Sequence, residues 1–297
     1  MSEKVTLMRK FLKIAAMVVM VAVSGVFLLS LQGCGGDKPD DYEYELTTTD
    51  ATIKGLINRD LEKLDIPDDI DGVPVTKIGN DAFMQCTMIT SVDLPDTVTS
   101  IGNRAFGGCV SMKSISLPDS LTKIGSASFS ECTSLKSIDL PKSVKSIGPY
   151  AFENCNKITS IKIPESVTKI ERYTFFGCTN LKSIDLPNKV SKIDNAAFCN
   201  CKSLKNIGFT NYISTITNAS FQGCESLTKV VIPKSVTKIE SFAFKDCTGL
   251  TRIDIPATVT SIGDKAFENC PNLTIYGEKG SKAESHARAN KISFKEL

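Results

Sequence analysis

The chain is poor in the residues that most often build catalytic and metal sites. Its 297 residues contain no Trp and a single His, so most metal centres and His-dependent nucleophilic mechanisms lack the residues they need. Net charge is also small, because 35 Lys and Arg nearly balance 33 Asp and Glu to leave +2. A nucleic-acid-binding protein usually carries a clustered basic excess, so the composition argues against nucleic acid as a partner.

What the chain does contain is an internal repeat of 23 residues. The sequence Ala-Phe-Glu-Asn-Cys occurs at Ala151–Cys155 and again at Ala266–Cys270, and the interval of 115 residues is five times 23. A Phe recurs at the 23-residue interval nine times, at Phe83, Phe106, Phe129, Phe152, Phe175, Phe198, Phe221, Phe244 and Phe267. A Cys follows each Phe by three residues, at Cys86, Cys109, Cys132, Cys155, Cys178, Cys201, Cys224, Cys247 and Cys270. Such an array grows by stacking units rather than by enlarging one core.

Each repeat unit predicts a short strand followed by a return to the next unit. Ile138 and Leu140 alternate with polar residues, which is the period of a strand with one buried face. Pro141 then ends the strand, because proline has no N–H to donate to a sheet ladder. Val144 and Ile147 are expected to point back inward. One unit has too few apolar residues to form a core alone, so the units must stack into a parallel solenoid.

The pattern L-x-x-I-x-L-P-x-x-V-x-x-I-G-x-x-A-F-x-x-C resembles the 23-residue leucine-rich repeat of the BspA-type bacterial surface proteins. The resemblance spans about Leu61–Tyr276, which is more than two-thirds of the chain. It implies a leucine-rich-repeat solenoid with parallel β-strands on one face and loop or short-helical returns. It also implies an adhesin or interaction protein that is displayed on the cell surface.

The two flanks of the array predict caps. Residues 42–60 have the alternation of a β-hairpin, which could cover the first unit. Residues 61–276 are expected to form the solenoid of nine 23-residue units, and residues 277–297 a C-terminal cap. This cap is predicted to contain a short amphipathic helix with Ser281 as its N-cap. Caps are expected because an open array must shield its last hydrophobic unit from water.

The first 33 residues predict a signal peptide of the lipoprotein type. Four basic residues precede the uncharged run Ile14–Leu31, and Leu31–Cys34 resembles a bacterial lipobox, in which the Cys is lipidated. Cys34 is therefore the expected lipid attachment site, and residues 34–41 the linker that follows it. The alternative is an uncleaved membrane anchor, since this run is just short of the roughly 20 residues that span a bilayer. Either prediction places residues 40–297 outside the cytoplasm.

Eleven cysteines in an exported protein would ordinarily suggest a disulfide framework. Nine of them share one repeat position, so stacking predicts a column of thiols about 5 Å apart beside the Phe column. We expect a structural ladder of free thiols; disulfides between neighbours and metal binding are the alternatives. Cys199 lies outside the column at a permissive position and is expected to be accessible to solvent. His286 is expected to be a solvated surface residue of the C-terminal helix.

Without a catalytic or metal-binding constellation, and with no cofactor expected, candidate contacts must come from the surfaces. The outward face of the strands carries rows of Lys, from which Lys136, Lys182 and Lys205 are candidate partner contacts. The alternative for these lysines is a face that is simply solvated.

Three tyrosines are further candidate contacts. Tyr212 stands where Ser or Thr normally sits, in a unit whose Thr210 replaces the usual Pro. The alternative here is drift of the repeat with local repacking. Tyr150 and Tyr173 occupy one repeat position in adjacent units, so they are expected to stack on the opposite surface.

The sequence thus predicts a monomeric, non-enzymatic interaction or adhesion protein that a lipid anchors to the membrane at the cell surface. Its expected partner is a protein or glycan of the host matrix or of neighbouring cells, bound through the repeat surface. Few Trp, Tyr or Arg side chains lie on the strand face, so the contact should be broad and of modest affinity. A protein that organises the envelope without a specific ligand is the alternative, and an enzyme with an unrecognised site is the remaining class.

Overall fold

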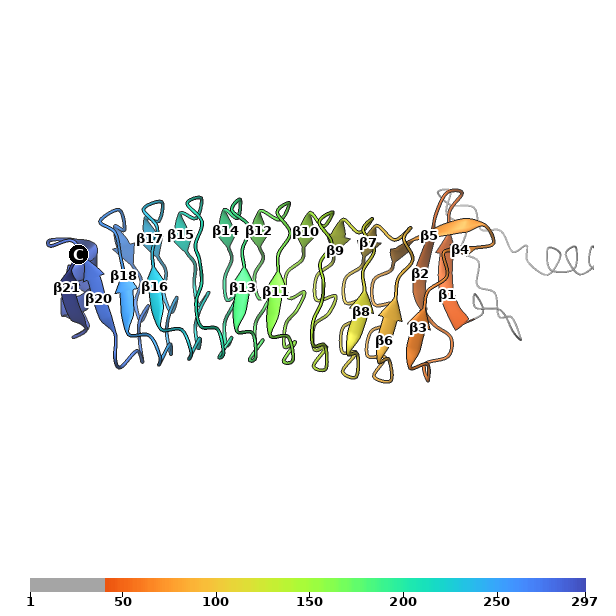
Figure 1. The fold of residues 1–297 in the computed structure, drawn as a ribbon, viewed down its shortest axis with the longest axis horizontal. Helices are drawn as coiled ribbons and strands as arrows, with labels where there is room; N and C mark the ends of the chain where they lie inside the picture. Colours follow the sequence, from red (N-terminus) through yellow and green to blue (C-terminus); the bar gives the residue numbers. More distant parts are fainter. Residues whose placement is uncertain (1–40) are drawn as a thin grey trace, which may run out of the picture.

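The computed structural model describes residues 41–297, which form a single file of stacked rungs, each rung being one 23-residue turn of chain (Figure 1). This confirms the predicted leucine-rich-repeat solenoid. The predicted signal peptide, the lipid attachment site Cys34 and the linker up to residue 40 lie outside the described residues.

Most rungs contribute a first strand to a row of parallel strands along one face, which we call the first-strand face. The strand predicted at Ile138 and Leu140 is absent, as is its equivalent around Ile207, although Ile138 is buried in the core as predicted. In the three-residue strands the middle side chain is buried and its two neighbours point outward, as in Ser-Ile-Asp of β13. Adjacent strands pair in register at intervals of 23 residues, for example Ile161 with Ile184. The strands of this face are β3 (Lys63–Asp65), β6 (Ser91–Asp93), β8 (Ser114–Ser116), β11 (Ser160–Lys162), β13 (Ser183–Asp185), β16 (Lys229–Val231), β18 (Arg252–Asp254), β20 (Thr274–Gly277) and β21 (Ser293–Glu296).

A second short strand follows in most rungs, after the proline corner, and the alternation in the sequence did not indicate it. These strands also pair in parallel and form the second-strand face, with a buried Ile at the end of each two-residue strand. They are β5 (Val73–Ile78), β7 (Ser100–Ile101), β9 (Lys123–Ile124), β10 (Ser146–Ile147), β12 (Lys169–Ile170), β14 (Lys192–Ile193), β15 (Thr215–Ile216), β17 (Lys238–Ile239) and β19 (Ser261–Ile262).

The third side of each rung is the return, which we call the turn side. It consists of consecutive turns rather than a helix, and two residues in each rung have positive φ. In one rung these are Tyr150 (φ 60°) and Asn154 (φ 56°). The left-handed conformation reverses the chain tightly enough to bring the buried Phe and Cys of each return back beneath the strands.

The Phe and Cys columns form the centre of the core. Consecutive Phe rings are stacked from Phe83 to Phe267, with centroids 5.1–5.8 Å apart. All ten described cysteines are free, which confirms the predicted thiol ladder. From the second ladder member onward, each thiol donates to the backbone carbonyl of the Phe in the preceding rung, as Cys178 Sγ does to Phe152 at 3.1 Å. The ladder therefore joins neighbouring rungs by weak hydrogen bonds.

Both ends of the array are capped. At the N-terminal end, β1 (Tyr42–Leu46) and β2 (Ala51–Leu56) form an antiparallel hairpin, and β2 continues the second-strand face by pairing with β5. The two-residue strand β4 (Asp69–Ile70) pairs with β5 across the turn at Asp71 and Gly72. At the other end, helix α2 (Lys282–Ala289) begins after Ser281, whose side chain accepts the N–H of Glu284 as the predicted N-cap.

Candidate interaction surface

Exposed lysines without an ion pair follow the first-strand face near the centre of the part of the molecule that the structure describes. Lys136, Lys182 and Lys205 are exposed and form no ion pair with any of residues 41–297. The second-strand face differs, because four of the five lysines in its strands form an ion pair, whereas Lys123 forms none with the described residues. Lys169 lies 2.7 Å from Glu171, and Lys238 lies 2.9 Å from Glu240. The predicted lysine contacts therefore lie on the face that has charge available for a partner.

Tyr212 lies at the corner where the chain leaves the first-strand face, and 66% of its surface is exposed. In six other rungs a corner Ser or Thr donates to a backbone carbonyl of the preceding rung, as Ser143 does to Leu121 at 2.6 Å. Tyr212 makes no such bond; instead the buried hydroxyl of Thr210 donates to the equivalent carbonyl, that of Val190. The two departures from the repeat are thus coupled. Thr210 replaces the inter-rung bond, which leaves the tyrosine side chain free to project into solvent.

The structure adds an apolar spot that sequence reasoning missed. Val231, in β16, is 54% exposed on the first-strand face. In the preceding rung the equivalent residue is Gly208, beside which a side chain would meet only open space. Aspartates occupy the same position in the two flanking rungs, at Asp185 and Asp254. The sequence does carry a signal for this apolar spot. At intervals of 23 residues from Asp93 to Asp254 the residue at this position is polar, except at Gly208 and Val231.

Tyr150 and Tyr173 stack as predicted, with ring centroids 4.8 Å apart and planes 4° from parallel. They lie on the turn side and are only half-buried. Phe176 packs against Tyr173 at 5.6 Å, and the Arg172 guanidinium lies 5.8 Å from the Tyr150 centroid. The structure therefore brings these aromatic residues together in one cluster, and separates that cluster from the first-strand lysines by the Phe core.

The expectation for Cys199 is wrong, because its side chain is 6% exposed. Its row on the turn side holds residues of very different kinds, yet none of its nine members is fully exposed. At a rung spacing of about 5 Å, larger neighbours such as Phe176 and Gln222 leave little room for water around a small side chain. Burial also raises the pKa of Cys199 to about 11, so the thiol is protonated at neutral pH.

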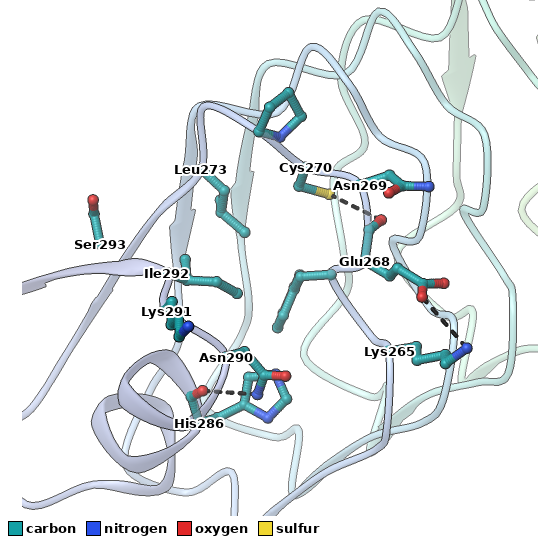
Figure 2. A pocket seen from close by; sticks show the side chains of 12 residues that line it. Lys265, Glu268, Asn269, Cys270, Leu273, His286, Asn290, Lys291, Ile292 and Ser293 are labelled. Atoms are coloured by element: carbon teal, nitrogen blue, oxygen red, sulfur yellow. Dashed lines mark hydrogen bonds and ion pairs between the residues drawn. The ribbon is translucent and has the colours of Figure 1, made fainter.

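The expectation for His286 is also wrong. Ala283 and Ala287 turn one face of α2 onto the last rung, and His286 shares that face. Its ring lies edge-on to Phe267 at 5.6 Å and ends the Phe column, as Tyr42 does against Phe83 at the opposite end. Burial, and next the charge of Lys282, lower the pKa of His286, so the imidazole is neutral at pH 7. Figure 2 shows it beside a pocket of about 530 Å³ between the last rung and the cap.

Other kinds of site find little support among the described residues. No three His, Cys, Asp or Glu side chains of residues 41–297 lie close enough together to hold a metal ion. The cysteines that could act as nucleophiles are buried, and burial raises the pKa of the ladder thiols well away from neutrality. In this part of the chain, α2 is eight residues long, and no helix has the length and apolarity needed to cross a membrane.

Comparison with known families and structures agrees with this architecture. Residues 57–181 and 145–274 match the sequence model of the BspA type leucine rich repeat region, in six copies. No curated protein sequence matches the chain. A leucine-rich repeat protein of Bacteroides ovatus is 24% identical with a TM-score of 0.58, over 87% of this chain and 98% of that one. At this identity the likeness concerns the fold.

Two further solved structures are similar in sequence but superpose less well. A leucine rich cell surface protein of Faecalibacterium prausnitzii is 26% identical over 85% of this chain and 96% of that one, with a TM-score of 0.43. The leucine rich repeat protein of T. pallidum is 31% identical over 56% of this chain and 89% of that one, with a TM-score of 0.49.

Proposed function

Because the chain belongs to the BspA-type leucine-rich-repeat family, we propose that it is a cell-surface interaction protein that binds a protein or glycan partner through its first-strand face. Proteins of this family are generally found at the cell surface and are generally not enzymes. The expected partner belongs to the host matrix or to a neighbouring cell. A lipid on Cys34 would hold a monomeric solenoid at the membrane, with the repeat surface turned outward.

The observation that carries this proposal is the exposure of Tyr212 in the same rung as Lys205. Tyrosine supplies a large apolar contact with a polar tip, and interfaces depend strongly on a few such residues. Among residues 41–297, Tyr212 is the one aromatic residue among the strongly exposed large side chains. Lys182, one rung away, adds a second unpaired charge.

The dimensions of the face suit a partner of ordinary size. Nine rungs at about 5 Å give a face about 40 Å long, which is enough for a standard interface of about 800 Å² per partner. Opposite charges are mixed on this face, with Asp139 and Asp185 among the lysines. Salt should therefore weaken binding only mildly, because exposed pairs are screened at physiological ionic strength.

The test is a binding assay with immobilised extracellular-matrix proteins and a glycan array, in which the full chain is compared with variants. Tyr212→Ala should weaken binding about tenfold, as expected for the loss of an aromatic anchor. Lys182→Glu with Lys205→Glu should lower it further. Lys123→Glu is the matched control, because Lys123 is an exposed, unpaired lysine on the second-strand face. It should leave binding unchanged.

Two outcomes would redirect this proposal. If binding survives Tyr212→Ala combined with both lysine reversals, the contact lies elsewhere. Tyr150→Ala and Tyr173→Ala would then test the cluster on the turn side. If no matrix protein, glycan or cell-wall fraction retains the full chain, the alternative of an envelope-structural protein without a specific ligand is favoured.

A further inference from the structure

The turn side of the solenoid is held together by a regular set of backbone hydrogen bonds. In each complete rung, three N–H groups at alternate residues donate to carbonyls of the rung that follows. In the eighth of the Phe-containing rungs, Phe242, Phe244 and Asp246 donate at 3.4, 2.8 and 2.8 Å. The acceptors are the carbonyls of Asp264, Ala266 and Glu268. The direction never reverses, so the donors of every rung face the C-terminal end of the array.

In the last rung the equivalent donors are the N–H groups of Lys265, Phe267 and Asn269. Within residues 41–297 the C-terminal cap follows instead of a further rung, and none of the three makes a hydrogen bond with any of these residues. The C-terminal cap does not replace the missing rung here. β21 pairs with β20 on the first-strand face, and α2 covers the core. The turn side of the last rung therefore remains an open edge of backbone donors, which another chain could satisfy.

A pocket lies directly in front of this edge. It has a volume of about 530 Å³, and the same three residues line it together with the cap (Figure 2). Its apolar wall includes Leu273 and Ile292. A row of parallel donors beside an apolar wall offers the two elements by which proteins bind extended peptides, because main-chain bonds give affinity and side-chain pockets give selectivity.

The charge around the pocket is positive. Lys265 and Lys291 line it, and both are exposed. The one carboxylate in the lining, Glu268, is held by Lys245 at 2.6 Å and by Lys265 at 3.4 Å. These two contacts lower the pKa of Glu268, the Lys245 hydrogen bond most of all. An occupant with acidic side chains would thus meet two lysines and no free acid.

A second copy of the chain does not fit this position. Its first rung would have to continue the Phe column, but the His286 ring stands edge-on at 5.6 Å from Phe267 and occupies that place. The N-terminal hairpin would obstruct the same contact from the other side, since Tyr42 covers Phe83. The occupant must therefore be a thin segment that reaches the turn side alone.

We propose that this open edge is a second binding site, separate from the first-strand face, which takes an extended acidic peptide of a partner polypeptide. The peptide carbonyls accept hydrogen bonds from the N–H groups of Lys265, Phe267 and Asn269. Acidic side chains of the peptide lie against Lys265 and Lys291. The peptide thereby completes the missing turn of the array.

The experiment titrates the full chain with a fluorescent, end-blocked hexapeptide of alternating Glu and Val, and with the same peptide carrying Lys in place of Glu. Only the acidic peptide should bind. Lys265→Glu with Lys291→Glu should weaken it at least about tenfold, as expected for reversed charge complementarity. Lys279→Glu is the matched control, since it reverses an exposed lysine of the same cap that does not line the pocket.

A second variant keeps the test independent of charge. Ser293 is exposed on β21 and lines the pocket, so Ser293→Trp should fill it and abolish binding while thermal unfolding of the chain stays unchanged. Hydrogen exchange should show protection of the segment around Asn269 when the acidic peptide binds. Tyr212→Ala should bind the peptide normally, which separates this site from the first-strand face. Equal binding of both peptides, full binding by the Ser293→Trp chain, or protection located elsewhere would each overturn the proposal.

Discussion

Replacing Phe152 by Ala tests whether the Phe column holds the rungs together. The side chain is completely buried, and its ring stacks on Phe129 at 5.5 Å and on Phe175 at 5.6 Å. A buried Phe→Ala change costs about 3–5 kcal/mol, because transfer energy is lost and a cavity remains. Both neighbouring rings are anchored in their own rungs and cannot collapse into the space. We therefore expect the upper half of that range, including about 0.5–1.5 kcal/mol for each lost ring pair.

The end of the column provides an internal comparison. Phe267 has one Phe neighbour, Phe244 at 5.8 Å, and the edge of His286 on its other side. Phe267→Ala should therefore cost less and should mainly fray the C-terminal end, since repeat arrays are stabilised by contacts between neighbours.

Urea unfolding followed by circular dichroism would measure both changes in the free energy of unfolding. Phe152→Ala should also broaden the transition, because it divides the array into two blocks. Lys157→Ala, an exposed change in the next turn of the same rung, should stay within about 0.5 kcal/mol of the parent chain. A cost below about 1 kcal/mol for Phe152→Ala, or equal costs at the centre and at the end, would refute a stabilising column.

Three other predictions concern the thiols, the N-terminal cap and the anchor. Native protein should resist alkylation at the nine ladder cysteines, because burial raises their pKa. Unfolded protein should be labelled at all nine. Four disulfides found by mass spectrometry would contradict the ladder of free thiols. A hydrogen bond from Lys77, and next one from Thr47, lower the pKa of Asp50 to about 2. The stability that Asp50 gives the hairpin is therefore present above about pH 4 and lost as the pH falls towards 2. Hydrogen exchange of β1 and β2 would detect this loss. A hairpin that opens as the pH rises would refute the predicted direction of the pH dependence. Cys34→Ala should abolish acyl labelling and release the protein from the membrane, and an unchanged mass with unchanged membrane association would rule out the lipid.

The repeat made much of the fold predictable. Leu, Ile, Phe and Cys recur at fixed places in each unit, so stacking alone places each in a column of its own kind. The same argument predicted the thiol ladder and the parallel strands with their proline corners. It also predicted the contact between Tyr150 and Tyr173, because equivalent positions in adjacent rungs must lie one rung apart.

The turns were less predictable, for reasons that differ between positions. One of the two positive-φ positions holds Gly, Asn or Asp in most rungs, for example Asn154 and Gly177, and so carries a signal in the sequence. The other holds residues such as Tyr150 and Phe242, which seldom adopt this conformation in isolation. This position lies between a second strand and a buried Phe, and the packing of these two neighbours imposes the left-handed conformation on it. The conformational preference of the residue itself does not indicate the turn.

The glycines of the Ile-Gly step illustrate the same limit. Their φ values are ordinary, as expected from the Glu and Thr found at this position in other rungs. Glycine is needed in these rungs because it has no side chain. A Cβ on Gly102 would lie 2.5 Å from the backbone of Gly79 in the preceding rung. Close approach of two rungs is a property of the stack and cannot be read from one unit.

The sequence by itself determined the architecture and the composition of the core, because 23-residue periodicity leaves one way to bury every apolar column at once. Tertiary structure alone decided the environment of single residues. It buried Cys199 beneath larger neighbours and placed His286 against the last Phe ring. At the corner of the rung it replaced the usual Ser or Thr hydrogen bond by one from Thr210, so that Tyr212 makes none there. It also left three N–H groups open at the last rung. These outcomes depend on which side chains meet across rungs 23 residues apart, and a pattern within one unit holds no information about its neighbours.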